Sequence, residues 1–259
     1  MLKDIISIAL VAGKEVLKIY NSSSNIVGYK PDDSPLTLAD QSSHKIILEK
    51  LKDLDPSFPI LSEEGIQTPF KERTHWKTFW LIDPLDGTKE FINRNGEFTI
   101  NIALIENKVP VMGVIYAPSL DTLYFAEKNQ GAYKLDHSSK VKDFIRQASN
   151  LPNQTVLKPK IVVSRSHLSR ETKEYINMIE ENYGETELIS VGSSLKFCYV
   201  AEGLAMYYPR LSPTMEWDTA AGQIIVEESG GHVLNYETNK PLCYNKDILK
   251  NPSFICKKE

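Results

Sequence analysis

Residues 80–88 read Trp-Leu-Ile-Asp-Pro-Leu-Asp-Gly-Thr, an apolar segment that runs directly into two carboxylates, a proline, a glycine and a threonine. The apolar part predicts a strand over residues 78–82 that ends at Asp83. Pro84 fixes a bend after this strand, so the two aspartates and the carbonyl between them can face one point. Gly87 lets an anion approach the backbone closely, and N–H groups at a helix start attract its charge. The stretch therefore predicts a bend that holds a metal ion and a phosphate.

Four acidic residues stand at the ends of predicted elements, namely Glu63, Asp83, Asp86 and Asp218. The first three lie at or just after predicted strand ends, where side chains leave a sheet and converge on a crevice. Hard divalent cations prefer oxygen ligands, and magnesium keeps several waters in octahedral geometry. No cluster of His or Cys residues in the sequence favours a softer metal. Each local pattern is common on its own, and it is their combination that predicts a magnesium site.

Two helices are predicted before the first of these strands. In residues 2–20 the apolar side chains recur at helical spacing with lysines opposite, which predicts an amphipathic helix packed on the body and not a cleaved signal. The second helix is predicted over residues 37–54, with Thr37 as its N-cap. Asp40 follows in the first turn, near the positive end of the helix dipole.

The rest of the chain divides into a strand-rich first half and an alternating second half. Further strands are predicted over residues 58–62, 98–105 and 109–117, followed by a hairpin over 123–135 and a polar connection over 136–159. The second half alternates strands with helices, which is typical of α/β layers. Its predicted elements are strands over 160–164, 187–191, 205–210 and 232–236, the last being the final strand, and helices over 169–181, 194–202 and 218–229.

The composition excludes several classes of protein. The chain has 259 residues, 41% of them hydrophobic, and a net charge of −4 without a long run of Lys or Arg. Binding to a nucleic acid polymer is therefore not expected. No stretch reaches the roughly 20 apolar residues of a membrane span. The cysteines Cys198, Cys243 and Cys256 form no Cys-x-x-Cys pair, which favours a reducing compartment over a disulfide framework.

The chain resembles the magnesium-dependent, lithium-sensitive phosphatases that include inositol monophosphatase. Within that superfamily it looks most like the CysQ-type 3'(2'),5'-bisphosphate nucleotidases. The resemblance runs almost end to end and is carried by motifs at residues 34–40, 61–64, 80–91, 94–99, 164–167, 192–198 and 217–222. The Lys-Glu-Phe at 89–91 and the Gly-Ser-Ser-x-Lys at 192–196 favour the nucleotidase branch over inositol monophosphatase.

The resemblance implies an α/β (α+β layered) fold of the sugar-phosphatase or inositol monophosphatase type, with alternating α-β-α-β-α layers. It implies one domain over residues 1–259, with a metal-binding lobe over about 1–135 and a substrate-binding lobe over about 155–259. Two or three Mg²⁺ ions are expected as cofactors. The implied metal ligands are Glu63, Asp83, the Leu85 carbonyl, Asp86 and Asp218.

The resemblance also implies roles in catalysis and in substrate binding. Glu63 and Thr88 are expected to orient the attacking water, with Asp40 as an acid/base group beside it. For Asp40 the alternative stays open that it is only a carboxylate of the first helical turn. Lys196 and Arg210 would supply positive charge for a second phosphate. The expected substrate contacts are Glu63, Leu85, Asp86, Gly87, Thr88, His167, Ser193, Lys196, Arg210 and Asp218.

The implied reaction is hydrolysis of the 3'-phosphate of adenosine 3',5'-bisphosphate to AMP, with phosphoadenylyl sulfate as a further candidate substrate. Two alternatives stay open: an inositol or sugar phosphatase, because a shared fold does not fix the substrate, and a non-catalytic nucleotide or metal sensor. The expected partner is a small nucleotide bisphosphate, and the chain is expected to be monomeric and cytoplasmic. Peripheral attachment to the cytoplasmic face of the inner membrane through the first helix stays open as well.

Overall fold

The computed structural model of the chain describes residues 1–22, 26–29, 35–154, 159–165 and 169–258. Within these residues the strands form a seven-stranded sheet (the large sheet), a five-stranded sheet (the small sheet) and a two-stranded hairpin of β1 (Ile26–Tyr29) and β2 (Pro35–Thr37). The large sheet contains, in spatial order, β3 (Ile60–Ser62), β4 (Thr78–Asp86), β5 (Thr99–Glu106), β6 (Val109–Ala117), β7 (Thr122–Glu127), β8 (Gly131–Asp136) and β9 (Ser149–Asn150). The small sheet contains β11 (Glu187–Val191), β10 (Lys160–Ser164), β12 (Tyr207–Arg210), β14 (Phe254–Lys257) and β13 (His232–Asn235).

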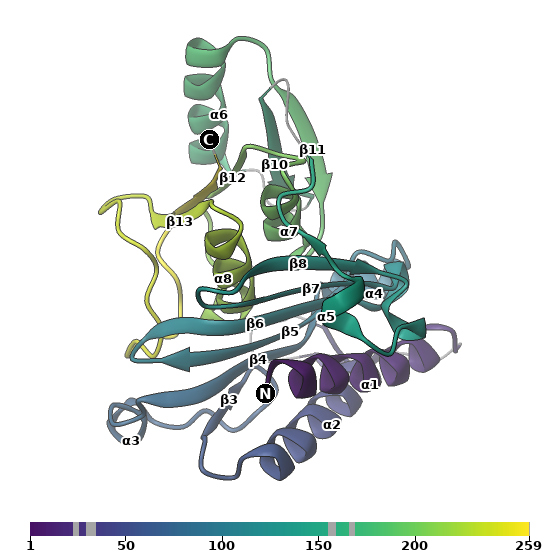
Figure 1. Cartoon of the computed structure of the whole chain (residues 1–259). Helices are drawn as coiled ribbons and strands as arrows, with labels where there is room; N and C mark the ends of the chain where they lie inside the picture. The colour runs from purple at the N-terminus through teal and green to yellow at the C-terminus, as the bar shows by residue number, and fades with distance from the viewer. Residues whose placement is uncertain (23–25, 30–34, 155–158, 166–168, 259) are drawn as a thin grey trace.

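Helices cover both sheets and separate them. The long ones are α1 (Leu2–Tyr20), α2 (Leu38–Leu54), α6 (Arg170–Tyr183), α7 (Leu195–Glu202) and α8 (Ala220–Glu228). Shorter pieces are α3 (Phe70–Arg73), α4 (Thr88–Ile92), α5 (Phe144–Gln147) and the 3-10 turns η1 (Pro118–Leu120), η2 (Ser138–Lys140) and η3 (Glu216–Asp218). Figure 1 shows α1 and α2 below the large sheet, α7 and α8 between the sheets, and α6 outside the small sheet.

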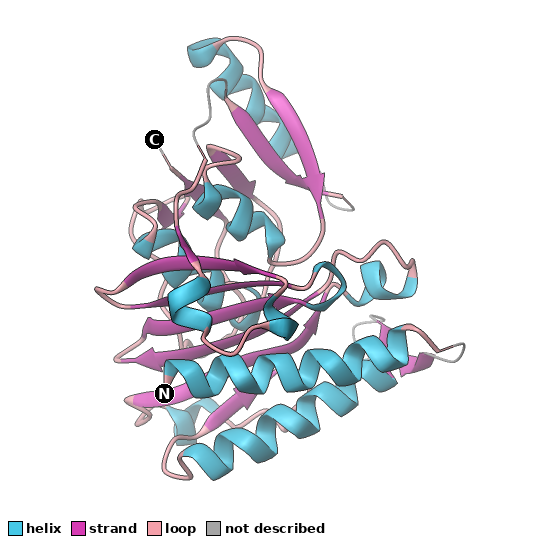
Figure 2. Ribbon diagram, turned by 45° about the vertical axis from the view of Figure 1, so that its right-hand side comes forward, coloured by secondary structure: helices cyan, strands magenta, loops and turns pink. Residues whose placement is uncertain are grey.

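The outer face of the large sheet is covered by α1 and α2, which lie side by side across it (Figure 2). The apolar stripe predicted in the first helix is its buried face, with Ile5, Ala9 and Val16 fully buried. At the start of α2 the Thr37 hydroxyl accepts from the backbone N–H of Asp40, whose carboxylate accepts from the Thr37 N–H in return. This capping box satisfies otherwise unpaired donors at the first turn and fixes where the helix begins.

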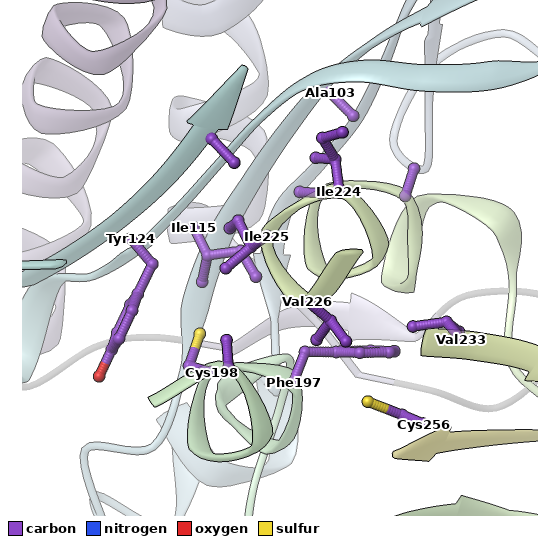
Figure 3. Close-up of a cluster of buried hydrophobic side chains, with 14 of the residues drawn as sticks. Ala103, Ile115, Tyr124, Phe197, Cys198, Ile224, Ile225, Val226, Val233 and Cys256 are labelled. Atoms are coloured by element: carbon purple, nitrogen blue, oxygen red, sulfur yellow. The ribbon is translucent and has the colours of Figure 1, made fainter. Parts of the chain in front are cut away.

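The space between the two sheets is filled by α7 and α8. Figure 3 shows Ile224 and Ile225 of α8 facing Ala103 and Ile115 of the large sheet. In the same view, side chains of α7 and of the small sheet complete one continuous apolar core, among them Phe197, Cys198, Val233 and Cys256.

On the far side of the small sheet, Ile176 and Ile179 of α6 pack on Ile161 and Tyr207 of its strands. The layers therefore run α-β-α-β-α, and the expected layered fold is confirmed.

Two sequence expectations about strands were wrong. The strand over 232–236 is not the final one, because β14 follows it and lies between β12 and β13, antiparallel to both. β14 is defined by its pairing with strands that are distant in the sequence, and the local sequence pattern does not predict such pairing. The strand predicted to end at Asp83 continues as β4 to Asp86, because pairing with β5 resumes there after an irregularity between those two residues.

The predicted helix over 218–229 also divides in two. Its first residue belongs to the 3-10 turn η3, and the α-helix proper begins at Ala220. Asp218 therefore sits on a short turn before α8 and not in its first turn.

Candidate active site

The bend between Asp83 and Asp86 is held by specific hydrogen bonds. The backbone N–H of Leu85 donates to Asp83 Oδ1 at 3.0 Å. The hydroxyl of Ser43, on α2, donates to the Pro84 carbonyl at 2.7 Å. Proline has no N–H to donate to a neighbouring strand. Pro84 is tolerated because it lies in the irregularity of the β4–β5 pairing, where no such hydrogen bond is needed. The bend lets Asp83 and Asp86 both line one cleft together with Leu85.

Glu63 and Asp218 join these aspartates from two other segments of the chain. β3 pairs in parallel with β4, and the N–H of Glu63 donates to the Ile82 carbonyl at 3.2 Å. Asp218 ends η3, where its Oδ2 accepts from the Met215 N–H at 2.8 Å. All four predicted acidic ligands line the same cleft, whose volume is about 380 Å³.

The four carboxylates of the cleft repel one another, and burial shields two of them, Asp83 and Asp218, from water. Burial, followed by the charges of Glu63, Asp86 and Asp218 and a hydrogen bond with Glu63, raises the pKa of Asp83 well above its usual range. Burial and the charges of Asp86 and Glu63 likewise raise the pKa of Asp218, and the hydrogen bond from the Met215 N–H and the charge of Arg210 oppose this only in part. A cation placed among these groups would remove the repulsion, so the site's electrostatics fit a bound metal ion.

The oxygen donors of the cleft fit magnesium, which keeps several water ligands, better than a metal ion whose ligands all come from the protein. In the described part of the chain, no three His, Cys, Asp or Glu side chains converge closely enough to hold an ion by themselves. Magnesium is usually bound through one or two carboxylates and keeps several waters, with substrate phosphate as a further ligand. Carboxylate pairs and the Leu85 carbonyl around an open cleft match that pattern.

Asp40 and Thr88 form a polar chain at the edge of the cleft. Asp40 is fully buried, and its Oδ2 accepts from the N–H and the hydroxyl of Thr37 at 2.7 and 2.6 Å. Its Oδ1 accepts from the Thr88 hydroxyl at 3.3 Å. The same carboxylate therefore caps α2 with one oxygen and contacts Thr88 with the other, so the two roles considered for Asp40 are geometrically compatible.

Asp86 has two polar neighbours that the sequence did not single out. The Ser194 hydroxyl lies 2.5 Å from Asp86 Oδ2 and 3.1 Å from the Asp218 carbonyl. The Asn101 amide donates to Ser194 Oγ at 2.7 Å. Asn101 is a buried amide between two isoleucines of strand β5, and a polar residue between apolar neighbours is the sequence signal that could have indicated it.

Ser193, Lys196 and Arg210, from the second half of the chain, line a pocket of about 180 Å³. Lys196 is buried, its ammonium group donates to the Ser193 carbonyl at 2.5 Å, and it lies 5.5 Å from the centre of the Tyr208 ring. Burial lowers the pKa of Lys196 to about 8, against the attraction of Asp86. The Arg210 Nε is buried and has no hydrogen-bond partner among the described residues. His167, a further predicted contact, lies outside the described residues.

The pocket and the cleft adjoin each other, and we call the two together the depression. Asp86, Gly87 and Asp218 line both, together with Lys89, Glu90 and Thr214. Gly87 has a left-handed backbone with φ of 91°, and a Cβ there would lie 3.2 Å from the Ser193 Cβ. Glycine is therefore required where the two halves of the chain meet. The depression is anionic at one end and cationic at the other, which suits a ligand with two phosphates.

The comparisons with known proteins identify the family. A sequence model of the inositol monophosphatase family matches residues 1–258. The chain belongs to the inositol monophosphatase family. Among family members, it is 44% identical to the 3'(2'),5'-bisphosphate nucleotidase CysQ of Salmonella typhimurium, covering 98% of each chain. It is 42% identical to the CysQ of Escherichia coli, again over 98% of each chain.

Solved structures show the same fold. The crystal structure of CysQ from Bacteroides thetaiotaomicron matches with a TM-score of 0.88 and 46% identity, covering 98% of this chain and 96% of that one. The suhB protein of Bartonella henselae matches with a TM-score of 0.77 and 25% identity, over 99% of this chain and 93% of that one. Within the described residues, no helix is long and apolar enough to cross a membrane.

Proposed function

We infer that this chain is a 3'(2'),5'-bisphosphate nucleotidase that hydrolyses the 3'-phosphate of adenosine 3',5'-bisphosphate to give AMP and phosphate. The observation that carries the inference is the depression in which a carboxylate cleft adjoins a pocket lined by Lys196 and Arg210. Relatives named for this activity match the chain over nearly its whole length. Phosphoadenylyl sulfate, which carries the same 3'-phosphate, is proposed as a second substrate.

The proposed cofactor is Mg²⁺, as two or three ions. When bound, magnesium lowers the pKa of water and stabilises negative charge on the phosphoryl and leaving oxygens. The residues proposed to hold it are Glu63, Asp83, Asp86, Asp218 and the carbonyl of Leu85, which all line the cleft.

Thr88 and Glu63 are proposed to orient the attacking water. The Thr88 hydroxyl donates its proton to Asp40, so its lone pairs are free to accept a hydrogen bond from a water beside the cleft. Asp40, held by two donors of Thr37, then favours the withdrawal of a proton through Thr88. Most of the catalysis would come from position and electrostatics, because phosphoryl transfer asks for little covalent chemistry from the protein.

The substrate's second phosphate is proposed to lie against Lys196 and Arg210, with Ser193, Gly87 and His167 as further contacts. Arg210 presents a fork of donors that suits phosphate, and its Nε has no other partner among the described residues. In this proposal the lobe of residues from about 1 to 135 supplies the metal ligands other than Asp218, and the lobe from about 155 to 259 adds Asp218 and reads the nucleotide.

We propose a monomer in the cytoplasm, bound to a small-molecule substrate. The three cysteines are free thiols, which is usual in a reducing compartment. Size-exclusion chromatography with light scattering tests the monomer. Cell fractionation tests attachment to a membrane face through α1.

A substrate panel tests the function. Phosphate release is measured with Mg²⁺ for adenosine 3',5'-bisphosphate, phosphoadenylyl sulfate, inositol 1-phosphate and fructose 1,6-bisphosphate, and then again with added Li⁺. The bisphosphate nucleotide should have the highest kcat/KM, and Li⁺ should inhibit. A higher kcat/KM for inositol 1-phosphate or the sugar would assign the chain to those phosphatases instead. Binding of the nucleotide without any turnover would identify a sensor.

A further inference from the structure

Glu216 is a fully buried carboxylate two residues before the proposed metal ligand Asp218. It accepts hydrogen bonds from the N–H groups of Asn245 and Lys246 at 2.7 and 3.0 Å. The ammonium group of Lys246 also donates to it, at 2.6 Å. This carboxylate therefore binds the turn at Asn245 and Lys246 tightly to η3.

The same turn is held from its other side by Arg73, which is also buried. The guanidinium Nη1 donates to the side-chain oxygen of Asn245 at 2.8 Å and to the Lys246 carbonyl at 2.6 Å. Its Nη2 donates to the Asp247 carbonyl at 2.8 Å. In return, the Asn245 amide donates to the Arg73 carbonyl at 2.6 Å. We call Arg73, Glu216, Asn245 and Lys246 the clamp.

The clamp joins two segments that carry metal ligands. Arg73 ends α3, in the connection from β3 to β4 that begins with Glu63. Glu216 begins η3, which ends with Asp218. The clamp therefore ties together the segments of Glu63 and Asp218, which approach the cleft from distant parts of the sequence.

A short turn such as η3 has little hydrogen bonding of its own to fix its position. Its backbone is held by groups in the connection between β13 and β14: Glu216 N–H donates to the Leu249 carbonyl at 2.9 Å, and the Asn251 amide donates to the Met215 carbonyl at 2.7 Å. Arg73 and Glu216 in turn hold that connection. The position of Asp218 thus depends on the clamp.

We propose that Arg73, Glu216 and Lys246 are positioning residues, which set the distance of Asp218 from Glu63 and so the affinity of the site for magnesium. The inference rests on the proposed magnesium-dependent function. Groups that orient metal ligands typically contribute about 10- to 100-fold to metal affinity or activity.

The chain offers a matched control in a second buried ion pair. Glu202 is buried at the end of α7, where its carboxylate accepts from Lys134 at 2.8 Å and from the Tyr124 hydroxyl at 2.6 Å. It lies at the opposite end of α7 from Ser194, about 12 Å of helix away. Its loss should disturb folding in the same way without moving a metal ligand.

The experiment compares E216Q and K246M with E202Q and K134M. Metal-free proteins are titrated with Mn²⁺, a spectroscopic stand-in for Mg²⁺, and bound metal is counted from the loss of the free-ion EPR signal. Melting temperatures in EDTA and the Mg²⁺ concentration for half-maximal turnover are measured in parallel. E216Q and K246M should bind Mn²⁺ about tenfold more weakly and need about tenfold more Mg²⁺. E202Q and K134M should stay within about twofold of wild type, although their melting temperatures fall too.

Equal Mn²⁺ affinities in wild type and all four variants would overturn the proposal. Equal losses of Mn²⁺ affinity in the clamp variants and in the control variants would do the same, and the clamp would then be a structural feature only. K246M keeps the two backbone donors to Glu216, so it provides a readout if E216Q does not fold. Failure of the proposed function looks different, since wild type itself would then not turn over the bisphosphate nucleotide, whatever its affinity for Mn²⁺.

Discussion

At the residue scale, Lys196 combines burial with a position in the proposed substrate pocket. Its pKa of about 8, lowered from an ordinary value of 10.5 by burial, places its titration just above neutral pH. At a pH between these two pKa values, Lys196 is mostly protonated in the unfolded chain and mostly neutral in the folded one. The cost that this lysine imposes on folding is therefore greatest below about pH 8 and fades as the pH rises toward 10.5. Near neutral pH the Lys196 ammonium group keeps its positive charge, which is available to bind a second phosphate.

Replacing Lys196 with glutamine should weaken transition-state binding of the bisphosphate nucleotide. A hydrogen bond to a charged group contributes about 1.5–3 kcal/mol, so kcat/KM at pH 7 should fall roughly 10- to 100-fold. In the wild-type enzyme kcat/KM should decline above about pH 8 as the ammonium group loses its proton, and Lys196→Gln should lose this decline. Steady-state kinetics against pH measure both effects.

The control substrate is 3'-AMP, which lacks the 5'-phosphate. Lys196→Gln should change its kcat/KM little. An equal loss with both substrates would show that Lys196 supports the fold of the pocket and does not read the second phosphate.

Asp83 provides the second prediction at this scale. Asp83→Asn should lower magnesium-dependent turnover by more than about 100-fold, because a direct ligand matters more than the groups that orient it. The metal-free variant should melt at or above the wild-type temperature, because a buried and repelled carboxyl group has been replaced by a neutral amide. Kinetics and thermal unfolding in EDTA measure this. Retained turnover would remove Asp83 from the proposed ligand set.

At the scale of elements, the position of α8 is set by two glycines. A Cβ on Gly222 would overlap the Phe197 ring of α7, and a Cβ on Gly113 would lie 2.8 Å from the Ala221 carbonyl. The helix can therefore approach both α7 and β6 more closely than side chains would allow. Since η3 and Asp218 directly precede α8, this close packing also helps to place the proposed metal ligand Asp218.

Gly222→Ala should destabilise the fold. Overpacking of a filled core costs typically about 1–3 kcal/mol, and each kcal/mol lowers Tm by roughly 2–4 °C in a chain of this size. Differential scanning calorimetry measures the change. Gly28→Ala is the matched control, because a Cβ there meets no atom of the described residues within 4 Å. An unchanged Tm for Gly222→Ala would mean that α7 moves away from the added methyl group without loss of folding free energy.

The element scale also shows where local pattern is sufficient. The cap of α2 at Thr37, the bounds of β6 and β10 and the start of α6 after Ser169 agree with the sequence prediction. These features depend on residues within a few positions of one another. The end of β4 could not be predicted, because it depends on where β5 resumes pairing beyond the proline.

At the scale of the whole molecule, the candidate site stores repulsion that metal binding would relieve. Adding Mg²⁺ at about 100 times its dissociation constant should stabilise the folded chain by about 2.7 kcal/mol per site, which raises Tm by roughly 5–10 °C over the value in EDTA. Thermal unfolding with and without Mg²⁺ measures this. Ca²⁺ at equal concentration should stabilise less, because the site supplies few protein oxygens for a larger coordination sphere.

Asp83→Asn is the informative variant for this measurement. It should lose most of the Mg²⁺-dependent rise in Tm while folding normally in EDTA. A full rise in that variant would locate the stabilising ion somewhere other than the cleft.

The sequence by itself determined the amphipathic helices, most strand positions, the capped start of α2 and the acidic residues that supply the candidate ligands. It did so because those features follow from spacing over one or two turns and from the chemistry of single side chains. The motifs also pointed to the family to which the chain belongs.

Only the tertiary structure decided which groups meet. Parallel pairing of β3 with β4 brings Glu63 beside Asp83, and Ser194 reaches Asp86 from 108 positions along the chain. Arg73 finds Asn245 across 172 positions. Such contacts depend on how whole layers pack, since the free energy that places one layer on another comes from apolar surface spread over the entire core. No local stretch of sequence contains that information.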